Sequence, residues 1–144
     1  MVISSDPRTH EVRDTLNQLK VRGKKLGVFS NDRAVGLGLV LSVMGLRSFF
    51  EYVETSESIG TEKPDPRVFE HILAHFQVEP NLVVYVGDDP VRDIEAAKKH
   101  GLRAIQYAVN ADKYNEKWRN YKKRILHQPD ATIHRFSELL DVLE

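Results

Sequence analysis

The sequence predicts an α/β fold of three layers, in which a parallel sheet has helices on both faces. Residues 26–30 (LGVFS) and 82–86 (LVVYV) are predicted strands, because they are short and apolar at nearly every position. Strands of this kind are buried on both faces, which is typical of parallel sheets wrapped by helices. Helical patterns separate these segments along the chain, as parallel connections require.

The composition excludes several classes of function. With 21 basic and 21 acidic residues the net charge is zero, so no overall field attracts nucleic acid or an anionic membrane. The chain has no cysteine, which excludes disulfides, thiolate catalysis and thiolate metal sites. No apolar run reaches membrane-spanning length, and residues 1–5 are too short for a signal peptide. We therefore expect one cytoplasmic domain over residues 1–144, without a nucleic-acid or membrane partner.

The first half of the chain predicts two helices and two strands. Residues 9–22 form a predicted helix that begins at Thr9 or at Asp6-Pro7 and ends at Gly23. After the strand at 26–30, residues 34–44 are apolar nearly all round and fit a helix packed on the sheet. Residues 52–55 are a weaker strand, and residues 56–65 are a predicted loop.

The second half of the sequence contains the same helix start signal at two places. Asp65-Pro66 and Asp89-Pro90 each place a capping residue before a proline, which predicts helices from residue 66 and over residues 90–100. Strands are expected at 103–107 and 131–133, and a closing amphipathic helix at 136–143. Residues 112–124 are strongly charged around Trp118 and suit either an exposed helix or an irregular insertion.

Polar side chains stand where the predicted strands end. Ser30 ends the first strand, Asp88 and Asp89 follow Gly87 after the second, and Asp93 comes one helical turn later. Ligands collect at the carboxyl ends of such strands. Carboxylates suit a magnesium ion, and a hydroxyl with the ammonium of Lys63 would bind phosphoryl oxygens. The pattern indicates a magnesium-dependent phosphoryl site, although Asp89 also suits a helix N-cap and Asp93 the first helical turn.

Three segments resemble motifs of the haloacid dehalogenase-like (HAD) hydrolase superfamily. LGVFSN (26–31), GTEKPDPRVF (60–69) and VYVGDDPVRDIEAA (84–97) resemble its motifs II, III and IV, in the family's order and at compatible separations. The resemblance covers most of the chain from residue 9 onward. It implies the family's Rossmann-like fold and hydrolysis of a small phosphorylated metabolite with Mg²⁺ as cofactor.

The resemblance also implies residue roles. The catalytic positions are Ser30 and Lys63, the phosphate-binding positions Ser30, Asn31 and Lys63, and the metal positions Asp88, Asp89 and Asp93. The adjacent acidic pair is more similar to the phosphatase branch than to the dehalogenase branch, because dehalogenation in this family works without a cation.

Motif I of the family is missing from this sequence. The family's nucleophile lies in an Asp-x-Asp-x-Thr segment, and the nearest text is at residues 1–9, with Ser4 and Asp6 in the two carboxylate positions. Asp6-Pro7 is more simply a helix start. We therefore expect a partial domain without the central motif I strand and the cap, and weak or absent activity.

The missing strand leaves two predicted strands with open edges, which are a liability in a sheet. Residues 1–5 could replace it, the strands at 26–30 and 82–86 could pair directly, or another chain could donate a strand, in a homo-oligomer or a hetero-complex. A non-catalytic binding or regulatory module is the alternative function. A receiver-like signalling domain is a weaker one, because receivers place the acidic pair before the lysine.

Overall fold

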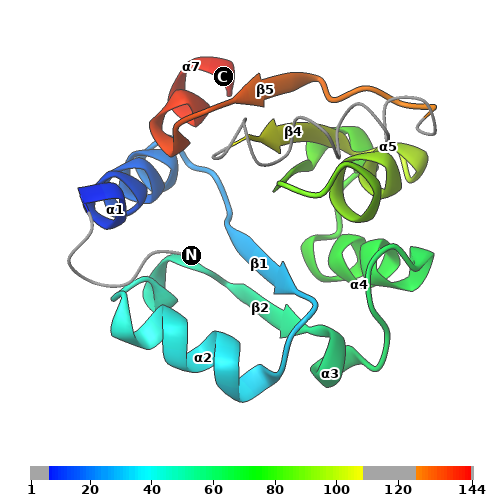
Figure 1. The fold of residues 1–144 in the computed structure, drawn as a ribbon, viewed down its shortest axis with the longest axis horizontal. Helices are drawn as coiled ribbons and strands as arrows, with labels where there is room; N and C mark the ends of the chain where they lie inside the picture. Colours follow the sequence, from blue (N-terminus) through cyan, green and yellow to red (C-terminus); the bar gives the residue numbers. More distant parts are fainter. Residues whose placement is uncertain (1–6, 109–125, 144) are drawn as a thin grey trace. The chain divides into compact units, whose positions relative to one another are not determined.

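The computed structural model describes residues 7–108 and 126–143. The chain divides into two compact units (Figure 1): unit 1 comprises the described residues 7–62 and 136–143, and unit 2 comprises 63–108 and 126–135. The nearest text to motif I, with Ser4 and Asp6, and the charged segment 112–124 lie outside the described residues. The expectation of one domain stays a prediction.

Unit 1 is built on two parallel strands. β1 pairs with β2 in parallel, with Gly27 opposite Tyr52 and Ser30 opposite Thr55. The elements of unit 1 are α1 (Pro7–Val21), β1 (Gly27–Ser30), α2 (Ala34–Val43), η1 (Arg47–Phe49), β2 (Tyr52–Thr55), α3 (Ser56–Ile59), η4 (Phe136–Glu138) and α7 (Leu139–Val142).

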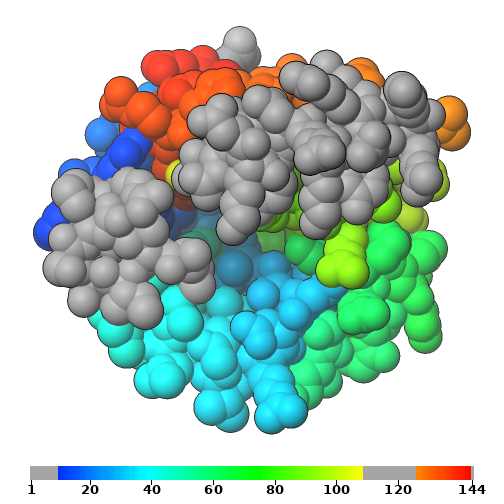
Figure 2. All heavy atoms as spheres, in the orientation of Figure 1, coloured from blue at the N-terminus to red at the C-terminus, as the bar shows by residue number. Residues whose placement is uncertain are grey.

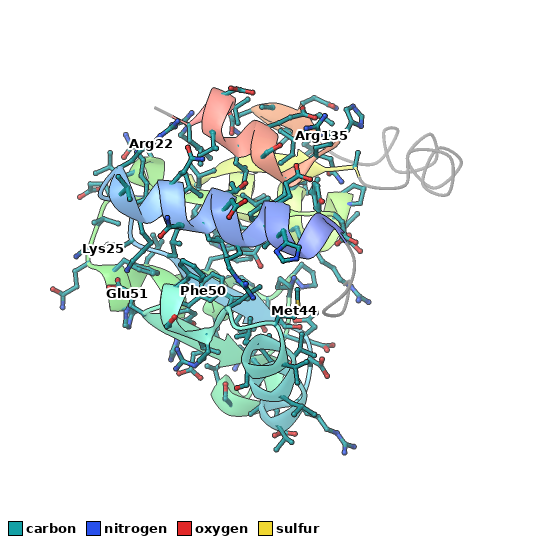
Figure 3. The ribbon with its side chains drawn as sticks, turned by 90° about the vertical axis from the view of Figure 1, so that its left-hand side faces the viewer. Arg22, Lys25, Met44, Phe50, Glu51 and Arg135 are labelled. Carbon is teal, nitrogen blue, oxygen red and sulfur yellow. The ribbon has the colours of Figure 1, made fainter. Side chains whose placement is uncertain are left out.

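The core of unit 1 lies between α1, α2 and the two strands. Its buried members are Leu16, Leu37, Leu41, Met44 and Leu46. Figure 3 shows Met44 and Phe50 on the side of α1 that faces α2 and the strands. The Arg13 guanidinium on α1 donates to the Met44 carbonyl at 2.9 Å, which joins α1 to the end of α2.

Unit 2 contains a three-stranded parallel sheet in the order β3-β4-β5. The middle strand places Gln106 opposite Gly87 of β3 and opposite Thr132 of β5. The elements of unit 2 are α4 (Pro66–Phe76), η2 (Pro80–Leu82), β3 (Val84–Gly87), η3 (Pro90–Glu95), α5 (Ala96–Lys99), β4 (Arg103–Tyr107) and β5 (Ala131–Ile133).

Phe69 of α4 is the largest fully buried side chain among the described residues of unit 2. Its ring contacts Tyr85 of β3 edge-on, with centroids 5.4 Å apart, and stacks on His100 at 5.2 Å. Ile94 and Ile133 are also fully buried. An apolar core of this kind holds the carboxyl ends of β3 and β4 in a fixed register.

The predicted fold class is confirmed, since parallel strands flanked by helices make up both units. The helix predicted from residue 9 begins at Pro7, which is the alternative start. Asp65 caps α4 as predicted, because its Oδ1 accepts from the Arg67 N–H at 2.9 Å. Gly45 ends α2 with a left-handed φ of 66°.

Three local predictions were wrong. The predicted loop at 56–65 begins with the short helix α3, because Thr55 and Ser58 form a reciprocal capping box. Leu82 was expected in a buried strand, but it belongs to η2 and is 70% exposed. The helix expected over 90–100 begins with the π-helical turn η3, in which the Asp89 carbonyl accepts from both Asp93 and Ile94.

Direct pairing of the strands that lead into motifs II and IV stays a prediction, because β1 belongs to unit 1 and β3 to unit 2. Within residues 7–108 and 126–143, β1 pairs with β2, and β3 with β4. Replacement of the central strand by residues 1–5 lies outside the described part, and donation by another chain stays a prediction. No helix in the described ranges is both long and apolar enough to cross a membrane.

Candidate functional site

Asp93 joins Lys63 to the loop after β3. Its carboxylate is only 3% exposed and both its oxygens are used, since Oδ1 accepts from Lys63 Nζ at 2.5 Å and Oδ2 accepts from the Asp89 N–H at 3.0 Å. A buried carboxylate requires such partners, because burying an unpaired charge is expensive. Lys63 also lies over the Tyr85 ring, 5.8 Å from its centroid. The predicted lysine and acidic loop are therefore brought together.

Gly87 is required by the packing of this carboxylate. A Cβ atom at residue 87 would overlap the Asp93 side chain, so no larger residue fits without a shift. The wide first turn of η3 follows directly and returns Asp93 toward Asp89. π-Turns of this kind occur frequently at functional sites.

Asp88 and Asp89 have different surroundings at the end of β3. Asp89 Oδ1 accepts from the N–H groups of Val91 and Arg92, at 2.9 and 2.8 Å, so it caps η3. Asp88 is exposed, while its backbone carbonyl accepts from Gln106 Nε2 at 2.6 Å. Asp89 is thus a helix N-cap, which was the alternative role expected for it. The metal-binding roles of Asp88, Asp89 and Asp93 stay predictions.

Ser30 and Asn31 belong to unit 1, at the carboxyl end of β1. The loop after them is fixed to α3, because the Asp32 carbonyl accepts from Ser56 Oγ at 3.3 Å. Their approach to Lys63 and Asp88 of unit 2 stays a prediction.

An open hollow of about 390 Å³ adjoins this loop in unit 1. It is lined by Asp32, Arg33, Ser56, Glu57, Gly60, Thr61 and Glu62. Three carboxylates against one guanidinium disfavour an anionic ligand. The hollow by itself is therefore not a phosphate site.

The carboxylates at the end of β3 fit a magnesium ion whose remaining ligands are waters and a phosphate oxygen. Within the described parts of the chain, no three histidine, aspartate or glutamate side chains are placed to share one ion. Magnesium, however, is usually held by one or two carboxylates, with waters and a phosphate oxygen completing its shell. Asp88 and Asp89 match that donor set.

Two features of the site were missed from the sequence. Gln106 is a polar residue that directly follows the apolar pair Ala104-Ile105 in a predicted strand. This break in the apolar pattern could have identified it. The capping box at Thr55 and Ser58 has the spacing of a helix start, yet α3 has only four residues. So short a helix gives little periodic signal.

Comparison with known proteins finds a matching family model and several relatives. A family model described as haloacid dehalogenase-like hydrolase matches residues 7–107. A glyceraldehyde 3-phosphate phosphatase of Methanopyrus kandleri is 35% identical over 133 residues, which cover 92% of this chain and 55% of that protein. Haloacid dehalogenase-like hydrolase domain-containing protein 3 of Homo sapiens is 38% identical over 106 residues, covering 70% of this chain and 41% of that protein.

The similar solved structures include a phosphatase and a dehalogenase. A HAD phosphatase from Thermococcus onnurineus superposes with a TM-score of 0.76 at 29% identity, covering 90% of this chain and 55% of that one. A 2-haloacid dehalogenase from Pseudomonas syringae has a TM-score of 0.75 at 33% identity, covering 92% and 51%. The chain spans about half the length of the curated relatives it matches. From the matched motifs, the relatives and the fold, the chain belongs to the haloacid dehalogenase-like hydrolase family.

Proposed function

We propose that this chain forms the phosphate- and magnesium-holding side of a phosphatase site for small phosphomonoesters. The observation that carries the proposal is the Asp93 carboxylate, which holds Lys63 on one oxygen and the Asp89 N–H on the other. Phosphatases among the relatives support it, including the glyceraldehyde 3-phosphate phosphatase of Methanopyrus kandleri. The substrate class is a small phosphorylated metabolite.

Each residue has a distinct task in this proposal. Asp88, with Asp89, would hold Mg²⁺, and the Lys63 ammonium would neutralise phosphoryl oxygens. Ser30 and Asn31 would donate hydrogen bonds to the same phosphoryl group. When bound, Mg²⁺ supplies a Lewis acid that stabilises the charge of the transferred group.

The nucleophile is the part that the motifs of this sequence do not provide. No Asp-x-Asp-x-Thr segment occurs in the 144 residues. Because loss of a nucleophile commonly lowers kcat by several orders of magnitude, we expect hydrolysis by this chain alone to be near background. A donated strand that carries the missing carboxylates would restore it.

Asp88→Asn is the variant that tests the proposal. Asp88 is exposed, so the change should leave the fold intact. Lys63→Met is unsuitable, because it would leave the buried Asp93 charge without its cation, at a cost of about 3–5 kcal/mol. Calorimetry should show Mg²⁺ binding that Asp88→Asn weakens about tenfold or more. Asp6→Asn is the matched control, and its affinity should equal that of the unmodified chain.

Hydrolysis of p-nitrophenyl phosphate is measured on the same three proteins. Magnesium-dependent hydrolysis abolished by both substitutions would mean that Asp6 belongs to a working motif I, contrary to the expected weak activity. Equal Mg²⁺ binding by the unmodified chain and Asp88→Asn would remove the metal role of Asp88. Release of chloride from 2-chloropropionate without Mg²⁺ would favour dehalogenation. Binding of Mg²⁺ and phosphate without hydrolysis, even with a donated strand, would favour the non-catalytic module.

A further inference from the structure

Gln106 presents a buried amide to the loop that carries the acidic pair. It lies on β4, the middle strand of the unit 2 sheet, and is 1% exposed. Its Nε2 donates to the Asp88 carbonyl at 2.6 Å, whereas its Oε1 has no hydrogen-bond partner among the described residues. A buried acceptor without a donor lowers stability. Packing alone therefore does not account for an amide here.

The peptide unit that joins Asp88 and Asp89 is held at both ends. Its carbonyl accepts from Gln106, and its N–H donates to Asp93 Oδ2 at 3.0 Å. Both holding side chains are buried, and Gly87 leaves the space that Asp93 occupies. A peptide held in this way cannot rotate freely. The directions in which the Asp88 and Asp89 side chains leave the backbone are thereby fixed.

We infer that Gln106 is a positioning residue for divalent-cation binding, acting through the backbone of Asp88. The inference rests on the proposed function, in which Asp88 holds the metal. Mg²⁺ demands nearly ideal octahedral geometry, so a ligand that can turn about its backbone binds it less well. Residues that orient metal ligands commonly change metal affinity by about 10- to 100-fold when replaced.

Gln106→Met separates positioning from stability. Methionine has a similar length and fills the same space, but it removes both the amide donor and the unpartnered acceptor. Asp88 is exposed as a residue, so we expect water to replace the lost amide at its carbonyl. We expect a melting temperature within about 2 °C of the unmodified chain, together with a Kd for Mg²⁺ raised about tenfold. The carbonyl ¹³C resonance of Asp88 should shift, because water replaces the amide as its hydrogen-bond donor.

Thr132→Val is the control for a polar-to-apolar change at an exposed position of the same sheet. Thr132 lies opposite Gln106 on β5, and the change likewise replaces a polar side chain with an apolar one. It should leave the Kd for Mg²⁺ unchanged. Gln106→Asn is the second variant, because it keeps the amide but is one methylene too short to reach the Asp88 carbonyl. It should weaken Mg²⁺ binding as Gln106→Met does, and it serves if the methionine variant does not fold.

The outcomes separate this inference from the proposed function. Unchanged affinity in both Gln106 variants, with binding lost in Asp88→Asn, would overturn the inference and leave the proposed function standing. Equal losses of stability and affinity in Gln106→Met and Thr132→Val would assign Gln106 to ordinary sheet packing. Absence of Mg²⁺ binding by the unmodified chain would overturn the metal role of Asp88, and the role of Gln106 with it.

Discussion

Two carboxylates of unit 2 are more acidic than usual. Burial raises the pKa of Glu95, but hydrogen bonds from the ring of His127 at 3.0 Å and from its backbone N–H at 2.8 Å outweigh this and lower it. Burial likewise raises the pKa of Asp130, while the Ala104 N–H at 2.7 Å and Lys98 at 2.9 Å bring it below its ordinary value. Both ionised groups are thus favoured by folding.

Unit 2 should therefore lose stability in acid. A carboxylate whose pKa is lowered on folding contributes stability that is complete above its unfolded pKa and is lost as the pH falls through the folded value. At pH 7, Glu95→Gln should lower the free energy of unfolding by about 1 kcal/mol, because charge-assisted hydrogen bonds become neutral ones. Urea titrations should show this difference shrinking below the usual pKa of 4.5.

Glu138→Gln provides the control for that series, since its carboxyl lies outside unit 2. A difference between Glu95→Gln and the unmodified chain that stays constant from pH 7 to pH 3 would contradict the assigned role of the ionised form.

The residues of the candidate site could be singled out from residue type and spacing, but the contacts between them could not. Lys63 and the Asp88-Asp89 pair were identified because a lysine and paired carboxylates follow predicted elements in a recognisable order. The contact between Lys63 and Asp93 spans 30 positions in the sequence, and local pattern carries no information on such a contact. The contact of Gln106 with the Asp88 carbonyl spans 18 positions and was missed for the same reason, although the polar residue itself stands out in the strand pattern.

At the level of elements, α2 has apolar side chains on both its buried and its exposed faces. Leu41 is 3% exposed and packs in the unit 1 core, whereas Leu39, two residues earlier, is 63% exposed. Val35 and Val43 share the exposed stripe with Leu39, one helical turn to either side. The atoms of α2 are cyan in Figure 2.

This difference predicts unequal effects from the same substitution. Leu41→Ala should lower the free energy of unfolding by about 2–5 kcal/mol, because it leaves a cavity in the core. Leu39→Ala should change it by less than about 0.5 kcal/mol. Urea unfolding followed by circular dichroism measures both, and similar losses would show that the exposed stripe is covered in solution.

Elements with long periodic patterns and capping signals were predicted well. α1 and α4 have both, whereas α2 is a continuous apolar run that ends before Gly45; the predicted positions of all three agree with the structure to within two residues. The π-turn η3 could not be predicted, because Asp89-Pro90 is an ordinary helix start. Its width follows from tertiary contacts of Asp93, which are not a local property of the sequence.

At the scale of the whole molecule, unit 1 is discontinuous in sequence. The chain leaves it after residue 62 and returns at residue 136. The returning segment is bound at the end of α1, where Arg22 (labelled in Figure 3), the residue after the helix, donates to the carbonyls of Leu140 at 2.8 Å and Leu143 at 3.1 Å. Glu11 also accepts from the Ser137 N–H at 3.0 Å.

Unfolding of unit 2 should therefore weaken unit 1, but not the reverse. With unit 2 unfolded, closing a loop of about 70 residues would cost roughly 4 kcal/mol. Ile94→Ala removes a fully buried side chain of unit 2 and should accelerate hydrogen exchange in both units. Leu41→Ala should accelerate it mainly in unit 1. Exchange that quickens only in the mutated unit in both proteins would contradict this asymmetry.

The same discontinuity sets an order of events during translation. Residues 63–135 leave the ribosome as one uninterrupted stretch, so unit 2 has all its strands before η4 and α7 have been made. The amino-terminal part of unit 1 emerges first, yet α1 gains the contacts with η4 and α7 only after residues 136–143 have been made. A chain that ends at residue 135 would thus have every strand of unit 2 but neither η4 nor α7, and α1 would lack the hydrogen bond between Glu11 and Ser137.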